Sequence, residues 1–317
     1  MRFHPTEEQL AIQDALKGTL EDAMPRERLE KIVNDGGDFD RESWNALMAL
    51  GLGGLALPES VGGAGLGLVD LAMGIEVLGQ DGVVGPVLQH CLAGLALNLA
   101  DDADAREAWL GKIASGETVA TVAFGGNWLP DSWAVTVAGG KASGVIGFVP
   151  GAEAADLILV GTQGGGLALI EKGAGVVVEA VQSADRTRRL SAVTFDGAPA
   201  SVLFEPGDAR VARIFDAALV LASADALGGA QYCLDLSVAY AKEREQFGVA
   251  IGRFQALKHQ LAQMALEVEP ARALMWYAAY AWDSQQDDAA RAAAMAKAHI
   301  ADRYVSVARA AVAAHGG

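Results

Sequence analysis

The chain has 317 residues, of which 52% are hydrophobic and 20% are charged, and its formal net charge is −16. This apolar fraction supplies a substantial core and argues against wholesale disorder, and the length is typical of two or three domains. The negative charge argues against a nucleic-acid-binding protein, because binding to phosphates requires a basic face.

The N-terminal stretch and the cysteines indicate the compartment. Residues 1–8 contain no apolar signal core, and no apolar run is long and uninterrupted enough to span a membrane. The two cysteines, Cys91 and Cys233, lie far apart, and no Cys/His spacing typical of zinc appears. We therefore expect a cytoplasmic protein with free thiols, no bound metal and no membrane association.

The first third of the chain is expected to be helical. Thr6 is a plausible N-cap, and apolar residues then recur at helical spacing. A glycine-rich loop around Gly62 and Gly63 interrupts the pattern. The expected helices cover residues 10–16, 41–50, 69–78 and 88–98.

The composition of the sequence changes near Glu117. From there, short runs rich in β-branched residues alternate with glycine and Asp/Asn. Such runs predict a small sheet or barrel. The expected strands cover residues 118–124, 134–138, 144–149, 157–160, 167–170, 175–181 and 191–195.

From about Asp208 the apolar residues return to helical spacing. Two further long helices fit residues 256–282 and 288–314, and short connections between long helices predict an antiparallel bundle. The prediction is an α+β, mainly α fold in three segments. These are a helical N-terminal domain (1–117), a barrel-like middle β domain (118–207) and a C-terminal helix bundle (208–317).

The segment from Arg244 to Gln255, between two long helices, is suited to holding a phosphorylated cofactor. Arg244 is a permanent cation with the geometry to bind a pyrophosphate in a bidentate manner. Gly248 permits a tight turn. Phe247 and Phe254 offer apolar faces, and Gln255 offers amide donors.

The order of helices, strands and helices, together with this segment, resembles the acyl-CoA dehydrogenase family over essentially the whole chain. The segment is similar to the family's R-x-x-F-G-x-x-I-x-x-x-Q signature, and Leu57 to Gly67 is similar to its P-E-x-x-G-G-x-G-L element, with Glu76 and Gly79 in the helix that follows. The latter element is mostly structural in the family, and we assign it no chemistry. The terminal His315-Gly316-Gly317 resembles a glycine pair that approaches the adenine side of FAD.

The resemblance implies an FAD-dependent oxidoreductase that removes the α-proton of an acyl-CoA thioester and passes the β-hydride to the flavin. It also implies a homo- or heterotetramer, because the signature loop reaches the FAD of a neighbouring subunit, and electron-transferring flavoprotein as the acceptor. The cofactor-binding residues that it implies are Arg244, Gln246, Phe247, Phe254, Gln255, Gly316, Gly317, Phe148 and Val149.

The sequence departs from the family where the catalytic base is expected. One family site for the glutamate base aligns with Ala218, and the arginine that commonly follows aligns with Leu219. Neither side chain can transfer a proton. The other family site lies beyond residue 317, so the catalytic residue is unknown from this sequence.

The flavin-lining motifs depart as well. The family's T-E-x-x-x-G-S-D segment corresponds to residues 123–128, which read Ala-Phe-Gly-Gly-Asn-Trp. Its W-I-T motif corresponds to Phe148-Val149-Pro150, in which Phe148 could stack on the flavin and Val149 could donate its N–H. Pro150 has neither an N–H nor a hydroxyl, and Ala313 replaces an adenine-side glutamine.

Three functions are compatible with this pattern. The preferred one is a divergent subunit of a heteromeric acyl-CoA dehydrogenase, acting on a bulky or steroid-derived acid, with the base supplied by a partner subunit. The second is a self-sufficient homotetramer whose glutamate lies beyond residue 317. The third is a non-catalytic binding or scaffold protein on the same fold, since fold does not establish function.

Overall fold

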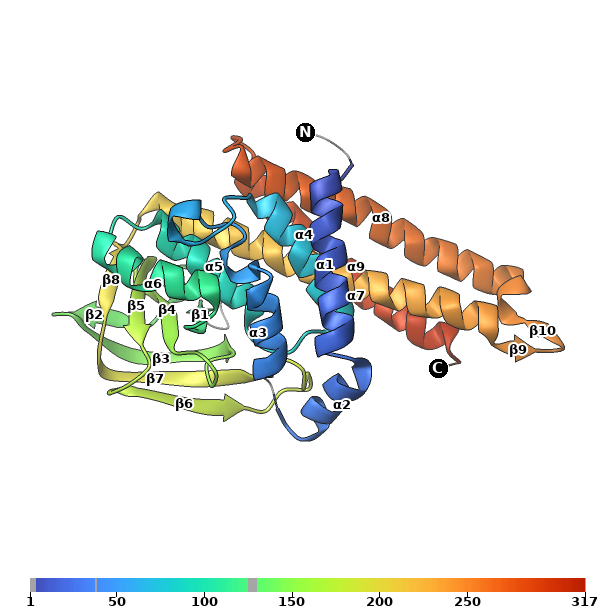
Figure 1. Cartoon of the computed structure of the whole chain (residues 1–317), viewed down its shortest axis with the longest axis horizontal. Coiled ribbons are helices and arrows are strands. Elements are labelled where there is room, and N and C mark those ends of the chain that lie inside the picture. The colour runs from blue at the N-terminus through green and yellow to red at the C-terminus, as the bar shows by residue number, and fades with distance from the viewer. Residues whose placement is uncertain (1–3, 38, 125–129, 317) are drawn as a thin grey trace. The chain divides into compact units, whose positions relative to one another are not determined.

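The computed structural model describes residues 4–37, 39–124 and 130–316, and it is mainly helical, as predicted (Figure 1). Its contacts divide the chain into two compact units. Unit 1 comprises Met1–Asp14, Leu68–Gly82 and Asp216–Gly317, and unit 2 comprises Ala15–Gly67 and Val83–Phe215. The division into three sequence segments stays a prediction.

Six α-helices precede the strands in the described part of the chain. The four predicted helices are present, and two more were missed, α2 and α6. Helix α2 carries a short apolar stripe of Leu29, Ile32 and Val33 at helical spacing, but it has only nine residues and buries none of them. The helices are α1 (Glu7–Ala23), α2 (Arg26–Asn34), α3 (Arg41–Ala49), α4 (Leu68–Asp81), α5 (Val87–Leu99) and α6 (Ala103–Ser115).

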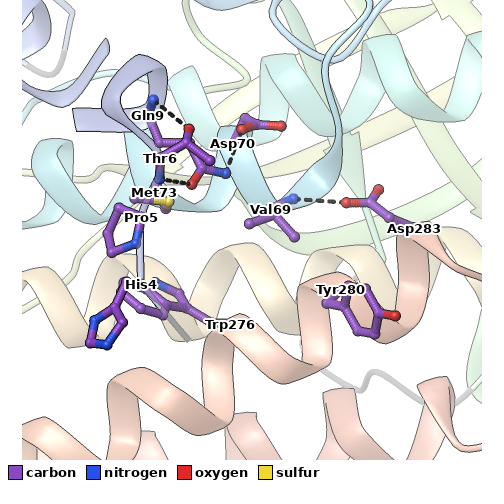
Figure 2. A pocket seen from close by; sticks show the side chains of 10 residues that line it. All are labelled: His4, Pro5, Thr6, Gln9, Val69, Asp70, Met73, Trp276, Tyr280 and Asp283. Carbon is purple, nitrogen blue, oxygen red and sulfur yellow. Dashed lines mark hydrogen bonds between the residues drawn. The ribbon is translucent and has the colours of Figure 1, made fainter. Parts of the chain in front are cut away.

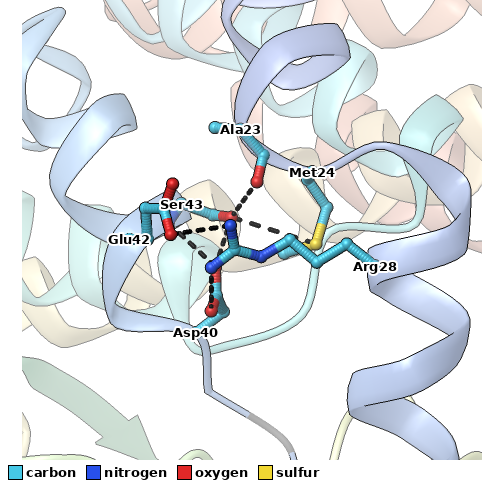
Figure 3. Close-up of polar contacts among 6 residues, drawn as sticks. All are labelled: Ala23, Met24, Arg28, Asp40, Glu42 and Ser43. Carbon is cyan, nitrogen blue, oxygen red and sulfur yellow. Dashed lines mark hydrogen bonds and ion pairs between the residues drawn. The ribbon is translucent and has the colours of Figure 1, made fainter.

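Side-chain caps start several of these helices. At α1, Thr6 Oγ1 accepts from the backbone N–H of Gln9 (3.2 Å) and Gln9 Oε1 accepts from that of Thr6 (2.9 Å), which is a capping box. At α3, Asp40 accepts from the backbone N–H of Ser43 (2.9 Å), and Arg28 bridges Asp40 and Glu42 (Figure 3). Burial acts to raise the pKa of Asp40, but the hydrogen bonds from Ser43 and Arg28 outweigh it and lower the pKa.

The middle of the chain forms two four-stranded sheets, with strand orders β1-β4-β5-β8 and β2-β3-β7-β6. The pair β1–β4 is parallel and the other neighbours are antiparallel. Buried residues of both sheets, such as Ile158 and Val193, form one core. The strands are β1 (Ala120–Ala123), β2 (Thr136–Ala138), β3 (Lys141–Pro150), β4 (Leu157–Thr162), β5 (Gly166–Glu171), β6 (Val176–Val181), β7 (Leu190–Pro199) and the unpredicted β8 (Ser201–Phe204).

A buried histidine ties the helices of unit 2 to its sheet. His90 of α5 is fully buried, and its Nε2 lies 2.8 Å from the carbonyl oxygen of Ile113 in α6. Its Nδ1 accepts from the backbone N–H of Ala120 in β1 at 3.2 Å, so the ring is neutral with the proton on Nε2. Burial lowers the pKa of His90 from 6.5 to about 4, although the contact with Ile113 acts to raise it.

The predicted C-terminal helices are present in α7 (Ala209–Glu243), α8 (Gln255–Asp283) and α9 (Ala289–Ala314) (Figure 1). A short connection joins α8 to α9, and the Nε2 of Gln260 donates to the carbonyl oxygen of Ala310 between them (2.8 Å). From Asp216 onward these helices belong to unit 1, which also contains α4.

Glycines allow α4 and α7 to approach each other closely. A methyl group on Gly228 of α7 would overlap the carbonyl oxygen of Glu76, and one on Gly79 of α4 would overlap that of Asp225. Only a residue without a side chain fits where two helix backbones touch in this way. The contact fixes the register of α4 on α7.

We predict that Gly228→Ala lowers the free energy of unfolding by about 1–3 kcal/mol, because the added methyl group forces two backbones apart. The matched control is Gly18→Ala in α1, where an added Cβ meets nothing within 4 Å. That change should be neutral or stabilise by about 0.5–1 kcal/mol through helix propensity. Urea unfolding of both variants checks this, and equal midpoints would contradict the close contact.

We also predict a stability loss on acidification through His90. Above pH 6.5, the pKa of His90 in the unfolded chain, the imidazole is neutral in both the folded and the unfolded chain. As the pH falls toward about 4, the unfolded chain binds a proton that the folded chain excludes. The loss approaches about 1.4 kcal/mol per pH unit, or about 3 kcal/mol in total. Unfolding of His90→Asn across the same pH range supplies the control, since its stability should vary less with pH. Parallel curves would show that His90 is not responsible.

Candidate functional site

The Arg244–Gln255 segment forms a β-hairpin between α7 and α8. Strands β9 (Glu245–Gln246) and β10 (Val249–Ala250) pair antiparallel, and a 3-10 turn at Ile251–Arg253 leads into α8. The carbonyl oxygen of Arg244 accepts from the backbone N–H of Ile251 (2.8 Å), which closes the base of the hairpin. The two turn residues, Phe247 and Gly248, have φ of +56° and +76°, as in the primed turns that suit two-residue hairpins.

Phe247 stands at the tip of this hairpin in a costly conformation. A bulky residue at positive φ is an outlier, and the left-handed conformation costs about 1–2 kcal/mol. Its side chain is also 92% exposed, with an edge contact to Phe254 at 6.0 Å between ring centroids. Strained backbone of this kind is concentrated at functional sites, which makes the tip a candidate contact surface.

The polar residues of the predicted clamp lie on the same hairpin. Within the described part of the chain, the Arg244 guanidinium forms no hydrogen bond or ion pair, and the residue is exposed. Gln246 is exposed and its Nε2 donates to the carbonyl oxygen of Glu245 (2.8 Å). Gln255 is the exposed first residue of α8. The structure therefore brings Arg244, Gln246, Phe247, Phe254 and Gln255 together at one surface.

The C-terminal turn of α9 lies beside the same end of α7. The rings of His315 and Tyr240 stack with centroids 4.4 Å apart. His315 Nδ1 lies 2.7 Å from the carbonyl oxygen of Ala311, so Nδ1 carries the proton. Gly316 has φ of +104°, and Gly317 lies outside the described residues. The backbone carbonyl oxygen of Tyr240 accepts from the backbone N–H of Arg244 (2.8 Å), so Tyr240 lies one helical turn before the hairpin.

Phe148 and Val149 belong to unit 2, and their side chains differ sharply in solvent exposure. A register shift between Ile146 and Val149 marks a bulge in β3, and Phe148 within it has φ of +57° and is 56% exposed. A bulge re-aims a side chain, and bulges are common beside active sites. The Val149 side chain is fully buried in register with Ser191, so only its backbone could contact a ligand. The Pro150 carbonyl oxygen accepts from Thr121 Oγ1 (2.7 Å).

The positions aligned with the family's base and arginine are apolar and buried. Ala218 is 3% exposed and Leu219 is 9% exposed, both within α7. Of the segment aligned with the T-E-x-x-x-G-S-D motif, Ala123 and Phe124 are buried, whereas Gly125, Gly126, Asn127 and Trp128 lie outside the described residues.

A buried ion pair in unit 1 escaped the sequence reasoning. Glu76 of α4, 5% exposed, pairs with Arg272 of α8. Arg272 also donates to Gln231 Oε1 in α7 (2.6 Å), and desolvation lowers the pKa of Arg272. The sequence carried a signal for it, because Glu76 is the one charged residue in the apolar run from Leu71 to Gly79. The contacts of Glu76 with Arg272 and of Arg272 with Gln231 therefore cross-link α4, α8 and α7, while Glu76 Oε2 is buried with no hydrogen-bond partner in the described part of the chain.

Unit 1 also contains a pocket of about 240 Å³ among the start of α1, the start of α4 and the end of α8 (Figure 2). None of the predicted cofactor-binding residues lines it. Over residues 4–37, 39–124 and 130–316, no helix is long and apolar enough to cross a membrane. Over the same ranges, no three His, Cys, Asp or Glu side chains gather where they could hold a metal ion.

Two protein-family models match parts of the chain. Residues 6–117 match the acyl-CoA dehydrogenase N-terminal domain, and residues 209–317 match the acyl-CoA dehydrogenase C-terminal domain. Acyl-CoA dehydrogenase FadE34 of Mycobacterium tuberculosis is 34% identical over 91% of the chain. The chain spans only 38% of the length of FadE34.

Two solved structures share the fold at high similarity. The Tcur3481–Tcur3483 steroid acyl-CoA dehydrogenase variant is 30% identical, with a TM-score of 0.90, over 98% of this chain and 87% of that one. The ChsE4–ChsE5 complex from Mycobacterium tuberculosis is 26% identical, with a TM-score of 0.90, over 100% of this chain and 88% of that one.

We predict that Phe247→Gly raises the free energy of unfolding of the isolated chain by about 1 kcal/mol, because glycine adopts the positive φ without strain. Phe247→Ala removes the same ring but keeps the strained conformation, so it should show no such gain. Thermal unfolding of the two variants beside the parent chain measures the difference. A destabilised Phe247→Gly variant would mean that the ring supports the fold.

Proposed function

Because the chain belongs to the acyl-CoA dehydrogenase family, we propose that it is one subunit of a heteromeric, FAD-dependent acyl-CoA dehydrogenase. The base that removes the α-proton comes from a partner subunit. The substrate class is an acyl-CoA thioester of a bulky or steroid-derived acid. Electron-transferring flavoprotein accepts the electrons.

This proposal rests on Ala218, whose buried methyl group occupies the position aligned with the family's base. Abstraction of an α-proton requires a group that can accept it, placed within hydrogen-bond reach. Ala218 and Leu219 offer none, and the buried carboxylate of Glu76 is paired with Arg272 through Oε1. A chain with the family fold and no base at this position suits a complex in which a second subunit supplies the carboxylate.

The residues of the hairpin fit the chemistry of FAD. A guanidinium without a partner in the described part of the chain matches a pyrophosphate, and Arg244 supplies it beside the exposed rings of Phe247 and Phe254. Gln246 and Gln255 add amide donors, and in unit 2 Phe148 presents an exposed ring at a bulge. FAD, when bound, accepts the hydride from the β-carbon; the role of these residues is to hold and orient it.

The relatives support the partner and the substrate class. The ChsE4–ChsE5 structure is described as a complex, and the Tcur3481–Tcur3483 protein is described as a steroid acyl-CoA dehydrogenase. An exposed, strained Phe247 is what a subunit that contributes to a site across an interface would present. These observations favour a heteromer over an isolated chain.

Co-expression tests the proposal. The chain is purified alone and together with an acyl-CoA dehydrogenase-like protein encoded beside it, and the visible absorption of each preparation is recorded. We expect flavin bands and dehydrogenation of a steroid acyl-CoA only in the co-purified complex. Flavin and activity in the chain alone would indicate a self-sufficient enzyme, and absence of flavin from every assembly would indicate a scaffold protein.

Arg244 supplies a sharper test of the clamp. Arg244→Ala should reduce flavin affinity of the assembled complex about tenfold or more, because a charge-assisted hydrogen bond contributes about 1.5–3 kcal/mol. Arg291→Ala is the matched control, since that arginine is exposed on α9 and pairs only with Asp288 in the described residues. Unchanged flavin content in Arg244→Ala would show that the hairpin does not hold the cofactor.

A further inference from the structure

A second pocket lies within unit 2, where the C-terminal end of α2 meets the connection from β6 to β7. Its volume is about 380 Å³, inside the range of about 300–1,000 Å³ typical of small-molecule sites. The side chains of Gln182, Ser183, Arg186 and Arg189 line it, and each can donate a hydrogen bond. The pocket therefore has the size and the chemistry to hold a ligand rich in acceptor atoms.

Arg186 is held in place by the end of α2. Its Nη2 donates to the backbone carbonyl oxygens of Val33 (2.8 Å) and Asn34 (3.3 Å), which belong to the last turn of that helix. Carbonyl groups at a helix C-terminus carry a partial negative charge, so they orient the guanidinium without neutralising it. The Nε and Nη1 groups of Arg186 form no hydrogen bond in the described part of the chain. They are available to a ligand.

Arg189 brings a second guanidinium to the same helix end. Gly36, just past α2, has φ of +80°, and a Cβ on it would lie 2.8 Å from Nη2 of Arg189. The lack of a side chain at Gly36 therefore makes room for the guanidinium. Arg189 Nη1 lies 3.8 Å from Glu153 Oε2, and the two side chains are 38% and 36% exposed. A long, exposed pair of this kind is weak, so Arg189 can bind an anion in its place.

The described lining of the pocket has an excess of positive charge. Asp185 is the one carboxylate in it, against two guanidiniums. Its Oδ1 accepts from the backbone N–H and the hydroxyl of Thr187 at 2.8 and 2.7 Å, as in an Asx turn. Among the described residues it forms no ion pair with Arg186 or Arg189. On a chain whose net charge is −16, this local excess attracts anions that the rest of the surface repels.

We propose that this pocket binds a phosphate group, as the free anion or as the monoester of a small molecule. Arg186 and Arg189 supply the charge, because a planar guanidinium matches the oxygens of a phosphate in a bidentate manner. Ser183 and Gln182 add neutral donors. The site lies in unit 2 and uses none of the hairpin residues, so it is independent of the flavin clamp and of the proposed dehydrogenase activity.

The test is an NMR titration of the ¹⁵N-glycine-labelled full chain with sodium phosphate at constant ionic strength. The amide of Gly36 reports on the pocket, and the amide of Gly248 reports on the hairpin, where Arg244 also attracts anions. Gly18 in α1 does not line the pocket and is the control. We expect a saturable shift of the Gly36 signal, with a Kd of about 1 mM or lower, and none at Gly18. A saturable shift at Gly248 without one at Gly36 would contradict the proposal.

A parallel titration with glycerol 3-phosphate identifies the source of the phosphate group. Tighter binding of the ester than of the free anion would assign the site to a phosphorylated small molecule, and equal binding would assign it to free phosphate. Glycerol itself should leave the Gly36 signal unchanged, because it has no charge for the guanidiniums to bind. If glycerol bound as tightly as its phosphate ester, the phosphate would not be the recognised group and the proposal would fail.

Matched variants test the guanidinium directly. Arg189→Gln removes the charge but keeps a donor, and it should weaken phosphate binding about tenfold or more. Lys141→Gln removes one positive charge from β3, in the same sheet as β6 but outside the pocket, and should change the affinity by less than about twofold because salt screens exposed charges. Unchanged circular dichroism of both variants establishes that they are folded. Equal affinities of the two variants, or no saturable Gly36 shift in the parent chain, would overturn the proposal.

Discussion

The close contact of α4 with α7 is the constraint on which unit 1 depends. The segment Leu68–Gly82 is flanked in the chain by residues of unit 2, yet it packs within unit 1. Glu76 secures it twice, because its backbone carbonyl touches Gly228 of α7 and its carboxylate pairs with Arg272 of α8. Breaking a buried ion pair by removing one partner strands the other charge. One residue therefore sets both the distance and the rotation of α4.

The position of the hairpin follows from the same helices. Arg244 comes directly after α7 and Gln255 begins α8, so the geometry of these two helices determines where the hairpin is presented. The fold holds Phe247 in a left-handed conformation at its tip with almost no contact of its own. The backbone strain at Phe247 therefore lowers the stability of this chain without a compensating contact within its described part.

Much of the fold could be predicted because apolar periodicity and turn residues carry it. The long helices α7, α8 and α9 and most strands were found in this way. Helix α2 was missed although Leu29, Ile32 and Val33 recur at helical spacing, because nine residues give only a short pattern. Strand β8 was missed because four residues give little alternation to detect. Of the candidate site, the sequence placed the R-x-x-F-G segment between two long helices, as observed. The bulge that turns Phe148 outward depends on strand pairing between distant residues. The ion pair of Glu76 likewise required knowledge of which helix lies opposite.

The exposed ring of Phe247 has a consequence for the life of the subunit in a cell. A single aromatic side chain, 92% exposed on a protruding turn, is the kind of surface that chaperones and proteases use to recognise an unassembled polypeptide. Assembly would hide it. In the heteromer proposed above, the abundance of this chain would then follow the supply of the partner subunit, without any regulation of synthesis.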